Sequence, residues 1–356
     1  MKLRLTKVGI IGLGSISKQI HLPVLSNMSG IKIEAATEID SKRGEKVAKR
    51  WKIPRFYVNY NDMFEDSTLD VVFICLPNYL HYETARSALQ HGLHVFCEKP
   101  MGLSSKDAIE LVEISKRKGL MLGVGLYKRF EKNYEKSASL IKGLKLGKVT
   151  QVHGILVNPG PHAGWKPCSD WFLKENSGGV IFDSGSHVID LVTYLLSDKI
   201  LEISAKSKNV LDGLRIFDNL AAVFNTEKGV IGTLNIGWQL STYYECIQIH
   251  GTGGSIFASP IEFEEMHGNF NALDKAFNHM RFAKSNIGWG VRKTFSSKRP
   301  DQAYFKEDKE FLDAVRKGEG RYVTGEEAVL VLDVLEALDE SLRTEKSVKI
   351  QYHYFS

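Results

Sequence analysis

The residues with the clearest capacity for chemistry are Glu98 and Lys99, which follow a short apolar run and precede Pro100. The run predicts a buried strand, which must end at Pro100 because proline cannot donate a hydrogen bond to a sheet. Glu98 and Lys99 would then lie at the carboxyl end of a strand, where ligands bind in open α/β sheets. A lysine held there can place a positive charge or a proton donor against a substrate oxygen. From composition alone, a solvated ion pair at a strand end is the commoner explanation.

Asp183 and His187 form a second candidate pair. They are four residues apart, so in a helix their side chains would share a face. Histidine can take a proton from an alcohol near neutral pH. A carboxylate one turn away can orient the substrate hydroxyl or raise the basicity of the imidazole. Taken alone, the pair also fits an ordinary helix start, with Asp183 or Ser184 as the cap.

A glycine-rich loop near the N-terminus is the candidate nucleotide site. An apolar strand pattern runs into Gly12 and Gly14, and Ser17 stands where a dinucleotide fingerprint has its third glycine. The glycines allow a sharp turn and a close approach to a pyrophosphate. The first turn of the following helix, with Ser15 and Ile16, would offer free N–H groups to the phosphate oxygens. Such a loop is a weak signal by itself.

The strand predicted at 31–37 adds a candidate ribose ligand. It ends at Glu38, close to where the fingerprint places a carboxylate on the ribose hydroxyls, and Asp40 is a rival for this role. A carboxylate at this place repels a 2′-phosphate, so NAD is favoured over NADP. Lys42 and Arg43 keep NADP open, because basic side chains can bind that phosphate.

Alternating helices and strands must position these residues. The patterns predict a helix capped by Ser41 and further strands and helices, which together imply a parallel sheet with right-handed crossovers. The helices are expected at 41–51, 79–91 and 104–118, and the strands at 8–11, 31–37, 69–76, 95–97 and 120–125. The later chain predicts helices at 131–146, 308–315 and 325–343, strands at 148–157 and 348–352, and antiparallel strands within 200–249.

Composition limits the class of protein. The chain has 356 residues, 43% of them hydrophobic, and a net charge of +5, which is too small to argue for nucleic acid. No apolar stretch approaches a membrane span, and the N-terminus does not have the pattern of a signal peptide. The four cysteines include no C-x-x-C pair, so no metal site is expected and a reducing, cytoplasmic setting fits.

Several of these motifs together resemble one enzyme family. They are Gly12-Leu13-Gly14, Pro77-Asn78 with His81, and Glu98-Lys99-Pro100. The combination is similar to the glucose–fructose oxidoreductase / inositol dehydrogenase (Gfo/Idh/MocA) family, whose G-G-x-x-x-D-x-x-x-H block places its Asp and His on Asp183 and His187. The resemblance covers nearly the whole chain. It implies an α/β fold, with a Rossmann doubly wound parallel sheet in residues 1–125. Residues 126–356 would form an α+β domain with a large, mostly antiparallel sheet for substrate binding and oligomerisation.

The resemblance also implies an activity. The chain would be an NAD(P)-dependent dehydrogenase that oxidises a secondary hydroxyl of a sugar, polyol or nucleotide-linked sugar. Lys99 would polarise the reacting oxygen, Asp183 would orient the substrate and His187 would act as general base. Cofactor contacts are expected from Gly12, Gly14, Ser15, Ile16, Glu38, Pro77, Asn78, His81, Glu98 and Lys99. A cis peptide before Pro100 and a homodimer or homotetramer through the C-terminal sheet are implied as well.

Three further residues are candidate substrate contacts. Tyr127 stands near a position where the family usually has Asn, which puts the substrate contacts in doubt. Arg129 could hold a substrate oxygen or the nicotinamide amide, with a salt bridge as the alternative. Trp165, with Trp171, could form an aromatic platform for a sugar, or could pack beneath the loop at 158–170. The basic segment at 289–299 is a solvated loop or a contact to a phosphorylated sugar.

Two other functions stay open at this stage. A redox-neutral NAD-dependent glycosidase would cleave a glycoside and release no NADH. A non-catalytic NAD-binding regulatory protein could use the same fold, although Lys99, Asp183 and His187 together argue against it. Free hexose, inositol, amino sugar and nucleotide-linked sugar all remain possible substrates.

Overall fold

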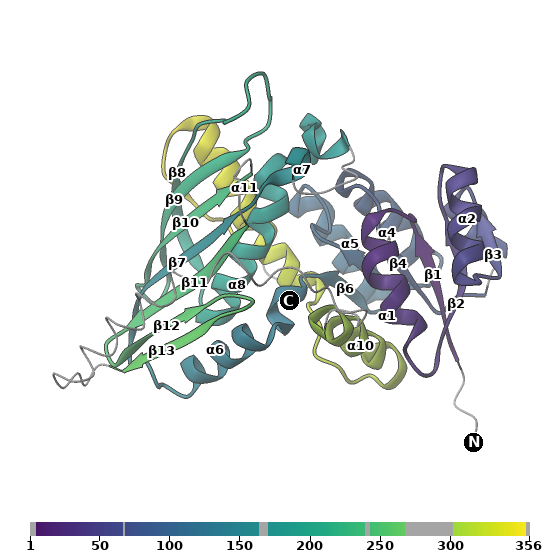
Figure 1. The fold of residues 1–356 in the computed structure, drawn as a ribbon, viewed down its shortest axis with the longest axis horizontal. Helices are drawn as coiled ribbons and strands as arrows, with labels where there is room; N and C mark the ends of the chain where they lie inside the picture. The colour runs from purple at the N-terminus through teal and green to yellow at the C-terminus, as the bar shows by residue number, and fades with distance from the viewer. Residues whose placement is uncertain (1–4, 67, 164–169, 239–242, 268–301, 354–356) are drawn as a thin grey trace.

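The computed structural model describes residues 5–66, 68–163, 170–238, 243–267 and 302–353, and it contains two sheets with helices between them (Figure 1). The first sheet has six parallel strands in the order β3-β2-β1-β4-β5-β6. They are β1 (Thr6–Ile11), β2 (Ile31–Thr37), β3 (Arg55–Tyr57), β4 (Val71–Ile74), β5 (His94–Glu98) and β6 (Leu122–Gly125). From β1 the strands are added outward to β3 on one side, and from β4 they are added outward to β6 on the other, so connections diverge between β1 and β4 and a ligand crevice opens at their carboxyl ends. The predicted Rossmann sheet is confirmed.

Helices cover both faces of this sheet, which is why all four residues of β4 are buried. They are α1 (Leu22–Ser26), α2 (Ser41–Trp51), α3 (Tyr60–Asp66), α4 (His81–Gln90) and α5 (Ser105–Lys118). The predicted Ser41 cap of α2 is wrong, because the Asp40 side chain accepts the hydrogen bond from the Arg43 amide at 3.0 Å. Asp40 is in extended backbone, outside the helix, where a capping side chain must stand.

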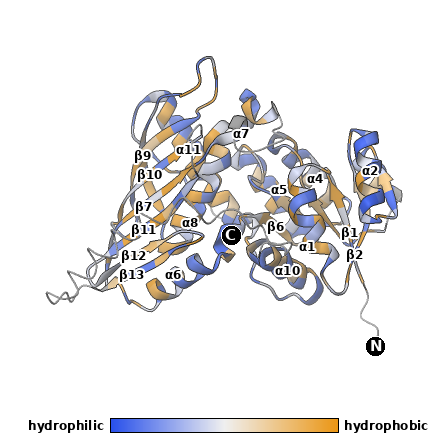
Figure 2. Ribbon diagram, in the orientation of Figure 1, coloured by the Kyte–Doolittle hydropathy of each residue, from blue (hydrophilic) through white to orange (hydrophobic). Residues whose placement is uncertain are grey.

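The second sheet has eight strands in the order β13-β12-β11-β7-β10-β9-β8-β14. They are β7 (Val149–Val157), β8 (Ile200–Ser207), β9 (Asn219–Thr226), β10 (Ile231–Gly237), β11 (Tyr244–Gly251), β12 (Gly254–Ala258), β13 (Phe263–His267) and β14 (Val348–Lys349). Among the strands that the structure describes in this sheet, only β7 and β10 pair in parallel, so the sheet is mostly antiparallel, as expected. Helices α8 (Ser186–Leu196) and α11 (Gly325–Thr344) lie against one face, and Figure 2 shows hydrophobic and hydrophilic residues alternating along the strands.

Shorter helical segments join these elements. They are η1 (Ser17–His21), η2 (Asn78–Leu80), η3 (Tyr127–Phe130), α7 (Gly160–Ala163), η4 (Asp170–Leu173), η5 (Glu175–Ser177) and η6 (Ile181–Gly185). Two predicted elements are shorter than expected: the helix at 131–146 is α6 (Lys132–Lys142), and the strand at 348–352 is β14.

Helix α10 (Gln302–Lys317) comes late in the sequence but packs with the first sheet, beside α1 (Figure 1). Phe311 and Leu312 from α10 are buried in the same core as Val8, Ile10 and Phe73. The helix begins six residues before the predicted start at 308. A late segment therefore completes the core of the nucleotide-binding region, and the division at residue 125 stays a prediction.

In the described part of the chain, no helix is both long enough and apolar enough to cross a bilayer. Cys75, Cys97 and Cys246 are buried free thiols, and Cys168 lies outside the described residues.

Candidate functional site

The glycine-rich loop lies at the crevice between β1 and β4. Gly12 has φ +89°, and a Cβ there would meet the Cys75 carbonyl oxygen at 2.7 Å, so the turn requires glycine. At Gly14 a Cβ would meet nothing within 4 Å, so this side of the loop is open. A helical stretch starts at Ser15 and Ile16 and continues through η1, and the first N–H groups of a helix have no partner within it. The loop thus offers amides toward open space, which is what a pyrophosphate needs.

Glu38 follows β2 and joins this loop to α2. Its Oε2 accepts from the Leu13 amide at 3.1 Å, and its Oε1 accepts from Arg43 Nη2 at 2.6 Å. The rival carboxylate of Asp40 is bound to the Arg43 amide as the helix cap. Of the two predicted ribose ligands, Glu38 is therefore the one held at the glycine loop.

The end of β4 carries Pro77, Asn78 and His81. Asn78 Nδ2 donates to the Ser177 carbonyl oxygen at 2.7 Å, while its Oδ1 is buried and has no hydrogen-bond partner within the described chain. A buried amide oxygen without a partner costs free energy unless a ligand or water binds it. The His81 ring lies between two carbonyl oxygens, 2.7 Å from that of Pro100 and 2.8 Å from that of Leu76. Its contacts hold the end of β4 against the segment after Lys99, and the peptide before Pro100 is cis, as the resemblance implies.

Lys99, directly after β5, and Asp183, in the middle of η6, are brought together. Lys99 Nζ lies 2.5 Å from Asp183 Oδ1 and 3.2 Å from the Asp183 carbonyl oxygen. An ammonium has three N–H donors, so these contacts leave one donor among the described neighbours. The two side chains are 15% and 13% exposed, so the pair is sheltered but reachable. This geometry can present a proton donor to a bound oxygen.

His187 is the second residue of α8, which directly continues the segment η6 that carries Asp183. Its Nδ1 is buried with no hydrogen-bond partner among the residues that the structure covers. Burial lowers the pKa of His187 well below 6.5, and the positive charges of Lys99 and Lys128 lower it further. The imidazole is therefore neutral at pH 7 and able to accept a proton.

Tyr127 and Arg129, from η3, have different surroundings. The Tyr127 ring meets the His187 ring edge-on at 5.4 Å between centroids, which puts Tyr127 beside the candidate base. Arg129 binds the Asp190 carboxylate through Nε at 2.9 Å and through Nη2 at 2.6 Å, and it also binds Glu327. These contacts form the salt bridge that the sequence had offered as the alternative to a ligand contact. A substrate that bound Arg129 would have to share N–H donors with Asp190 and Glu327.

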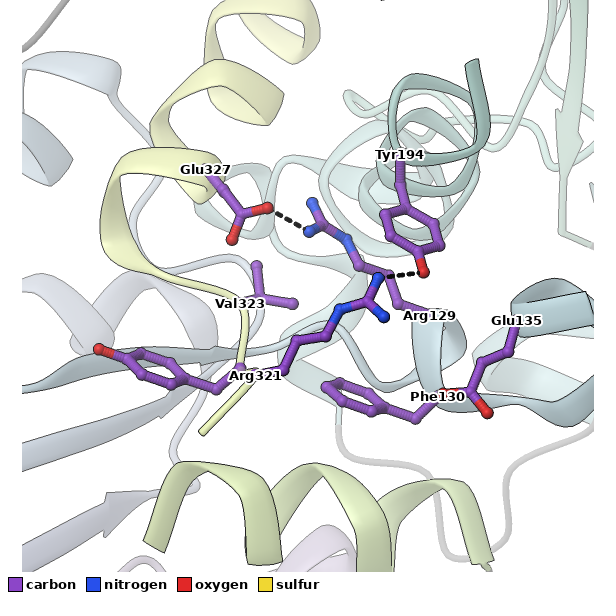
Figure 3. Close-up of a pocket in the computed structure, with 8 residues that line it drawn as sticks. Arg129, Phe130, Glu135, Tyr194, Arg321, Val323 and Glu327 are labelled. Carbon is purple, nitrogen blue, oxygen red and sulfur yellow. Dashed lines mark hydrogen bonds and ion pairs between the residues drawn. The ribbon is translucent and has the colours of Figure 1, made fainter. Parts of the chain in front are cut away.

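Arg129 also lines a hollow of about 110 Å³ (Figure 3). Figure 3 shows Arg129 reaching Glu327, and Arg321 reaching the Tyr194 hydroxyl. The described residues that line the hollow are Arg129, Phe130, Glu135, Tyr194, Arg321, Tyr322, Val323 and Glu327. Since neither Lys99 nor His187 is among them, this hollow is separate from the candidate catalytic residues.

Two predicted substrate contacts cannot be placed. Trp165 and the basic segment at 289–299 lie outside the described residues. Trp171, the other tryptophan of the proposed platform, stacks on Phe172 at 3.8 Å and meets Tyr79 edge-on at 6.3 Å. Its ring therefore has protein neighbours on two sides.

Family models match both parts of the chain. The model described as an oxidoreductase family with an NAD-binding Rossmann fold matches residues 6–126, and that of the GFO/IDH/MocA C-terminal domain matches residues 134–257. The chain belongs to the Gfo/Idh/MocA oxidoreductase family. The resemblance seen in the sequence is thereby confirmed, and so is the assignment as an NAD(P)-dependent oxidoreductase.

Relatives of this Gfo/Idh/MocA protein align over nearly its whole length. A myo-inositol 2-dehydrogenase of Thermotoga maritima is 24% identical over 350 residues, which cover 97% of this chain and 98% of the relative. A D-xylose 1-dehydrogenase (NADP+) 2 of Haloferax volcanii is 26% identical over 346 residues, covering 96% and 99%. The solved structure of a levoglucosan dehydrogenase in complex with NADH and levoglucosan has a TM-score of 0.83 at 19% identity, covering 98% of this chain and 100% of that one.

The residues present fit NAD, the cofactor that the description of the matching Rossmann model names. The open side of the loop at Gly14 has room for phosphate oxygens, and the Glu38 carboxylate lies at the strand end where ribose hydroxyls bind. The partnerless Oδ1 of Asn78 can accept from an amide. Glu98 does not point a free carboxylate at this site, because it binds His21 and the Lys99 amide.

Sequence reasoning missed a buried ionic cluster beside the site. Lys128 Nζ lies 2.6 Å from Glu245 Oε2, and Tyr134 donates to Glu245 Oε1 at 2.9 Å. Tyr243 also donates to this carboxylate. The basic run at 128–129 was visible in the sequence, but Glu245 is 117 positions away and nothing local pairs the two.

Proposed function

We propose that this protein oxidises a secondary hydroxyl of a sugar or polyol by hydride transfer to NAD, with Lys99, Asp183 and His187 as the catalytic residues. Support comes from the relatives and neighbours whose names specify inositol, xylose and levoglucosan dehydrogenases. One observation carries the proposal. Asp183 holds the Lys99 ammonium, which keeps one N–H donor for another molecule, and this ammonium is near enough to the buried imidazole of His187 for its charge to lower the pKa of that ring.

NAD, when bound, supplies the hydride acceptor, and the protein handles the proton. His187 takes the proton of the reacting hydroxyl, because its pKa lies below neutral pH and its ring is uncharged there. Lys99 donates its remaining hydrogen bond to the same oxygen as negative charge develops on it. Asp183 fixes the position of the Lys99 ammonium at 2.5 Å. Its second oxygen accepts from the Ser184 hydroxyl at 3.3 Å, and its other lone pair can accept from a substrate hydroxyl and orient it. The contacts of each group are thus compatible with the role proposed for it.

The test is NADH absorbance with the purified chain, NAD or NADP, and a panel of polyols, pentoses, hexoses, anhydrosugars and nucleotide sugars. We expect NADH formation with a member of the polyol or sugar classes, and no signal after replacement of His187 by Gln. If no member of the panel gives NADH, although calorimetry shows that NAD binds, the proposal is contradicted. Glycoside cleavage without NADH would instead favour the redox-neutral glycosidase.

We further propose that the outer face of the second sheet joins copies of this chain. Val223 on β9 and Ile231 on β10 are 54% and 56% exposed on strands that pair directly. Apolar side chains gathered on an uncovered sheet face favour association. Light scattering should give a dimer or tetramer, and the double substitution Val223→Lys/Ile231→Lys should lower the mass. A monomeric unmodified protein would contradict this.

A further inference from the structure

The side chain of His21 lies between two carboxylates that come from distant parts of the chain. Its Nδ1 is 2.9 Å from Asp308 Oδ2, on α10, and its Nε2 is 3.0 Å from Glu98 Oε1, at the end of β5. His21 and Asp308 are fully buried, and Glu98 is nearly so. Carboxylates accept hydrogen bonds, so an imidazole that donates to both from its two nitrogens carries two protons and a positive charge.

The line of contacts continues to the catalytic lysine. The second oxygen of Glu98, Oε2, accepts from the Lys99 amide at 3.2 Å. Asp308, His21 and Glu98 therefore form a buried series of hydrogen bonds that ends on the backbone of Lys99. Because each member is enclosed, the series fixes where the Lys99 side chain begins.

Helix α10, which carries Asp308, also reaches His187 through two aromatic rings. Tyr304 lies one turn before Asp308 on α10 and stacks on Tyr127, with ring centroids 3.9 Å apart. Tyr127 in turn meets the His187 ring at 5.4 Å. Helix α10 therefore reaches Lys99 through one set of contacts and His187 through another, although it comes from near the end of the chain.

We propose that α10 positions the two catalytic side chains relative to each other, and that Asp308 and His21 are positioning residues that hold Lys99 only while His21 is an imidazolium. The inference rests on the proposed function for the roles of Lys99 and His187. It adds a dependence on a charged histidine that touches neither substrate nor cofactor.

The groups around His21 determine when that charge is lost. They are Glu98 from β5, Asp308, Glu307 and Tyr304 from α10, and Cys75 after β4. Burial alone would lower the pKa of His21, but the Asp308 and Glu98 carboxylates outweigh it and raise that pKa well above 6.5. Burial raises the pKa of Cys75 to about 11, so this thiol is neutral at pH 7, and burial also raises the pKa of Glu307 well above 4.5.

The sign of the pH dependence follows. A histidine whose pKa is raised in the folded protein contributes its full stabilisation below pH 6.5 and loses it as the pH rises through the raised pKa. The Lys99 position should therefore loosen on the alkaline side. The neutral His187 required for catalysis controls the acid side, so the two histidines act at opposite ends of the pH–rate profile.

The adjacent carboxyl groups of α10 provide a matched pair of variants. In Asp308→Asn, which removes a charged partner of His21, kcat should fall about 10- to 100-fold through misplacement of Lys99, with the KM for NAD little changed. The alkaline limb of the pH–rate profile should move to lower pH. In Glu307→Gln, which replaces an equally buried carboxyl group that has no hydrogen-bond partner in the described chain, the alkaline limb should stay in place. A profile of Asp308→Asn that matches the unmodified protein would overturn the inference.

A measurement without substrate or cofactor separates this inference from the proposed function. In protein labelled with ¹⁵N-histidine and ¹⁵N-lysine, the ring nitrogens of His21 should report an imidazolium at pH 7. In Asp308→Asn they should report a neutral ring at lower pH, with a shifted Lys99 amide. A neutral His21 in the unmodified protein at pH 7 would overturn the inference.

If Asp308→Asn does not fold, His21→Gln replaces it in the kinetic test. Absence of turnover in the unmodified protein would count against the proposed function alone, because the histidine signals still decide the state of His21.

Discussion

Two lysine–carboxylate pairs lie near His187, and they differ in how much solvent reaches them. The Lys99–Asp183 and Lys128–Glu245 pairs have almost the same length, 2.5 Å and 2.6 Å. Both lysines lower the pKa of His187. In the first pair the side chains are 15% and 13% exposed, whereas in the second they are 3% and 2% exposed.

The partners of each carboxylate explain what the difference means. Glu245 accepts from Lys128, Tyr134 and Tyr243, so the buried pair is satisfied and joins η3 to β11. The Lys99 ammonium has only Asp183 as its partner in the described chain, which leaves a donor for another molecule. A lysine–carboxylate pair thus serves structure where it is enclosed and saturated, and under the proposed function it serves chemistry where it is open and incomplete.

Breaking the buried pair should give the largest effect, and the effect should be on stability. Lys128→Met leaves the Glu245 carboxylate without its counter-ion, so the free energy of unfolding should fall by about 3–5 kcal/mol. The double variant Lys128→Met/Glu245→Gln removes both charges and should recover much of the loss. Urea unfolding followed by circular dichroism measures both. Equal stability of Lys128→Met and the unmodified chain would mean that the two pairs do not differ as described.

Breaking the open pair should affect turnover rather than folding. Lys99→Ala removes the donor that faces the developing negative charge, so kcat should fall about 100- to 1000-fold while NAD still binds. The unfolding midpoint should change little, because the pair is partly solvated. Lys206→Ala is the matched control, since Lys206 also pairs with a carboxylate, Glu345, but on the surface. Unchanged turnover in Lys99→Ala would end the catalytic assignment.

The open half of this comparison could be predicted from the sequence, because it depends on local chemistry. Gly12 needs a positive φ, Pro100 ends β5 directly after Lys99, and Asp183 and His187 are spaced by about one helical turn. Each signal ties a residue type to a backbone geometry within a few positions. The family pattern then placed these residues in one site.

The buried contacts could not be predicted, because they join residues that the chain separates widely. His21 and Asp308 are 287 positions apart, and Lys128 and Glu245 are 117 apart. No periodicity encodes such pairs, since they depend on how α10 and β11 pack. Arg129 forms the salt bridge that the sequence had offered as one alternative, and its partner Asp190 lies on α8, 61 positions away.

The two carboxylates at the end of β2 offer a sharper version of the same contrast. Glu38 contacts the glycine loop, whereas the Asp40 side chain caps α2. In Glu38→Ser the like-charge repulsion against a 2′-phosphate disappears and Arg43 is released. The ratio of kcat/KM for NADP to that for NAD should therefore rise about 10- to 100-fold. Asp40→Ala is the control: it should cost about 1 kcal/mol of stability through the lost cap and leave the ratio unchanged. If the ratio changes in Asp40→Ala and not in Glu38→Ser, then Asp40, and not Glu38, is the carboxylate that discriminates against NADP.

The smallest expected effect is on the pKa of His187, which the positive charges of both lysines lower. Burial and the charges of Lys99 and Lys128 lower the pKa of His187, and a base must be neutral to act, so kcat/KM should fall only at a pH below 6.5. In Lys128→Met/Glu245→Gln the Lys128 charge is gone, whereas Glu245 is not among the groups that shift His187. The pKa of His187 should then rise, and the acid limb of the profile should move to higher pH while Lys99 and Asp183 keep their contacts. The measurement is kcat/KM from about pH 5 to about pH 8 for both proteins. An acid limb that stays in place would show that the buried pair acts on folding alone, and one that moves to lower pH would contradict the assignment of His187 as the base.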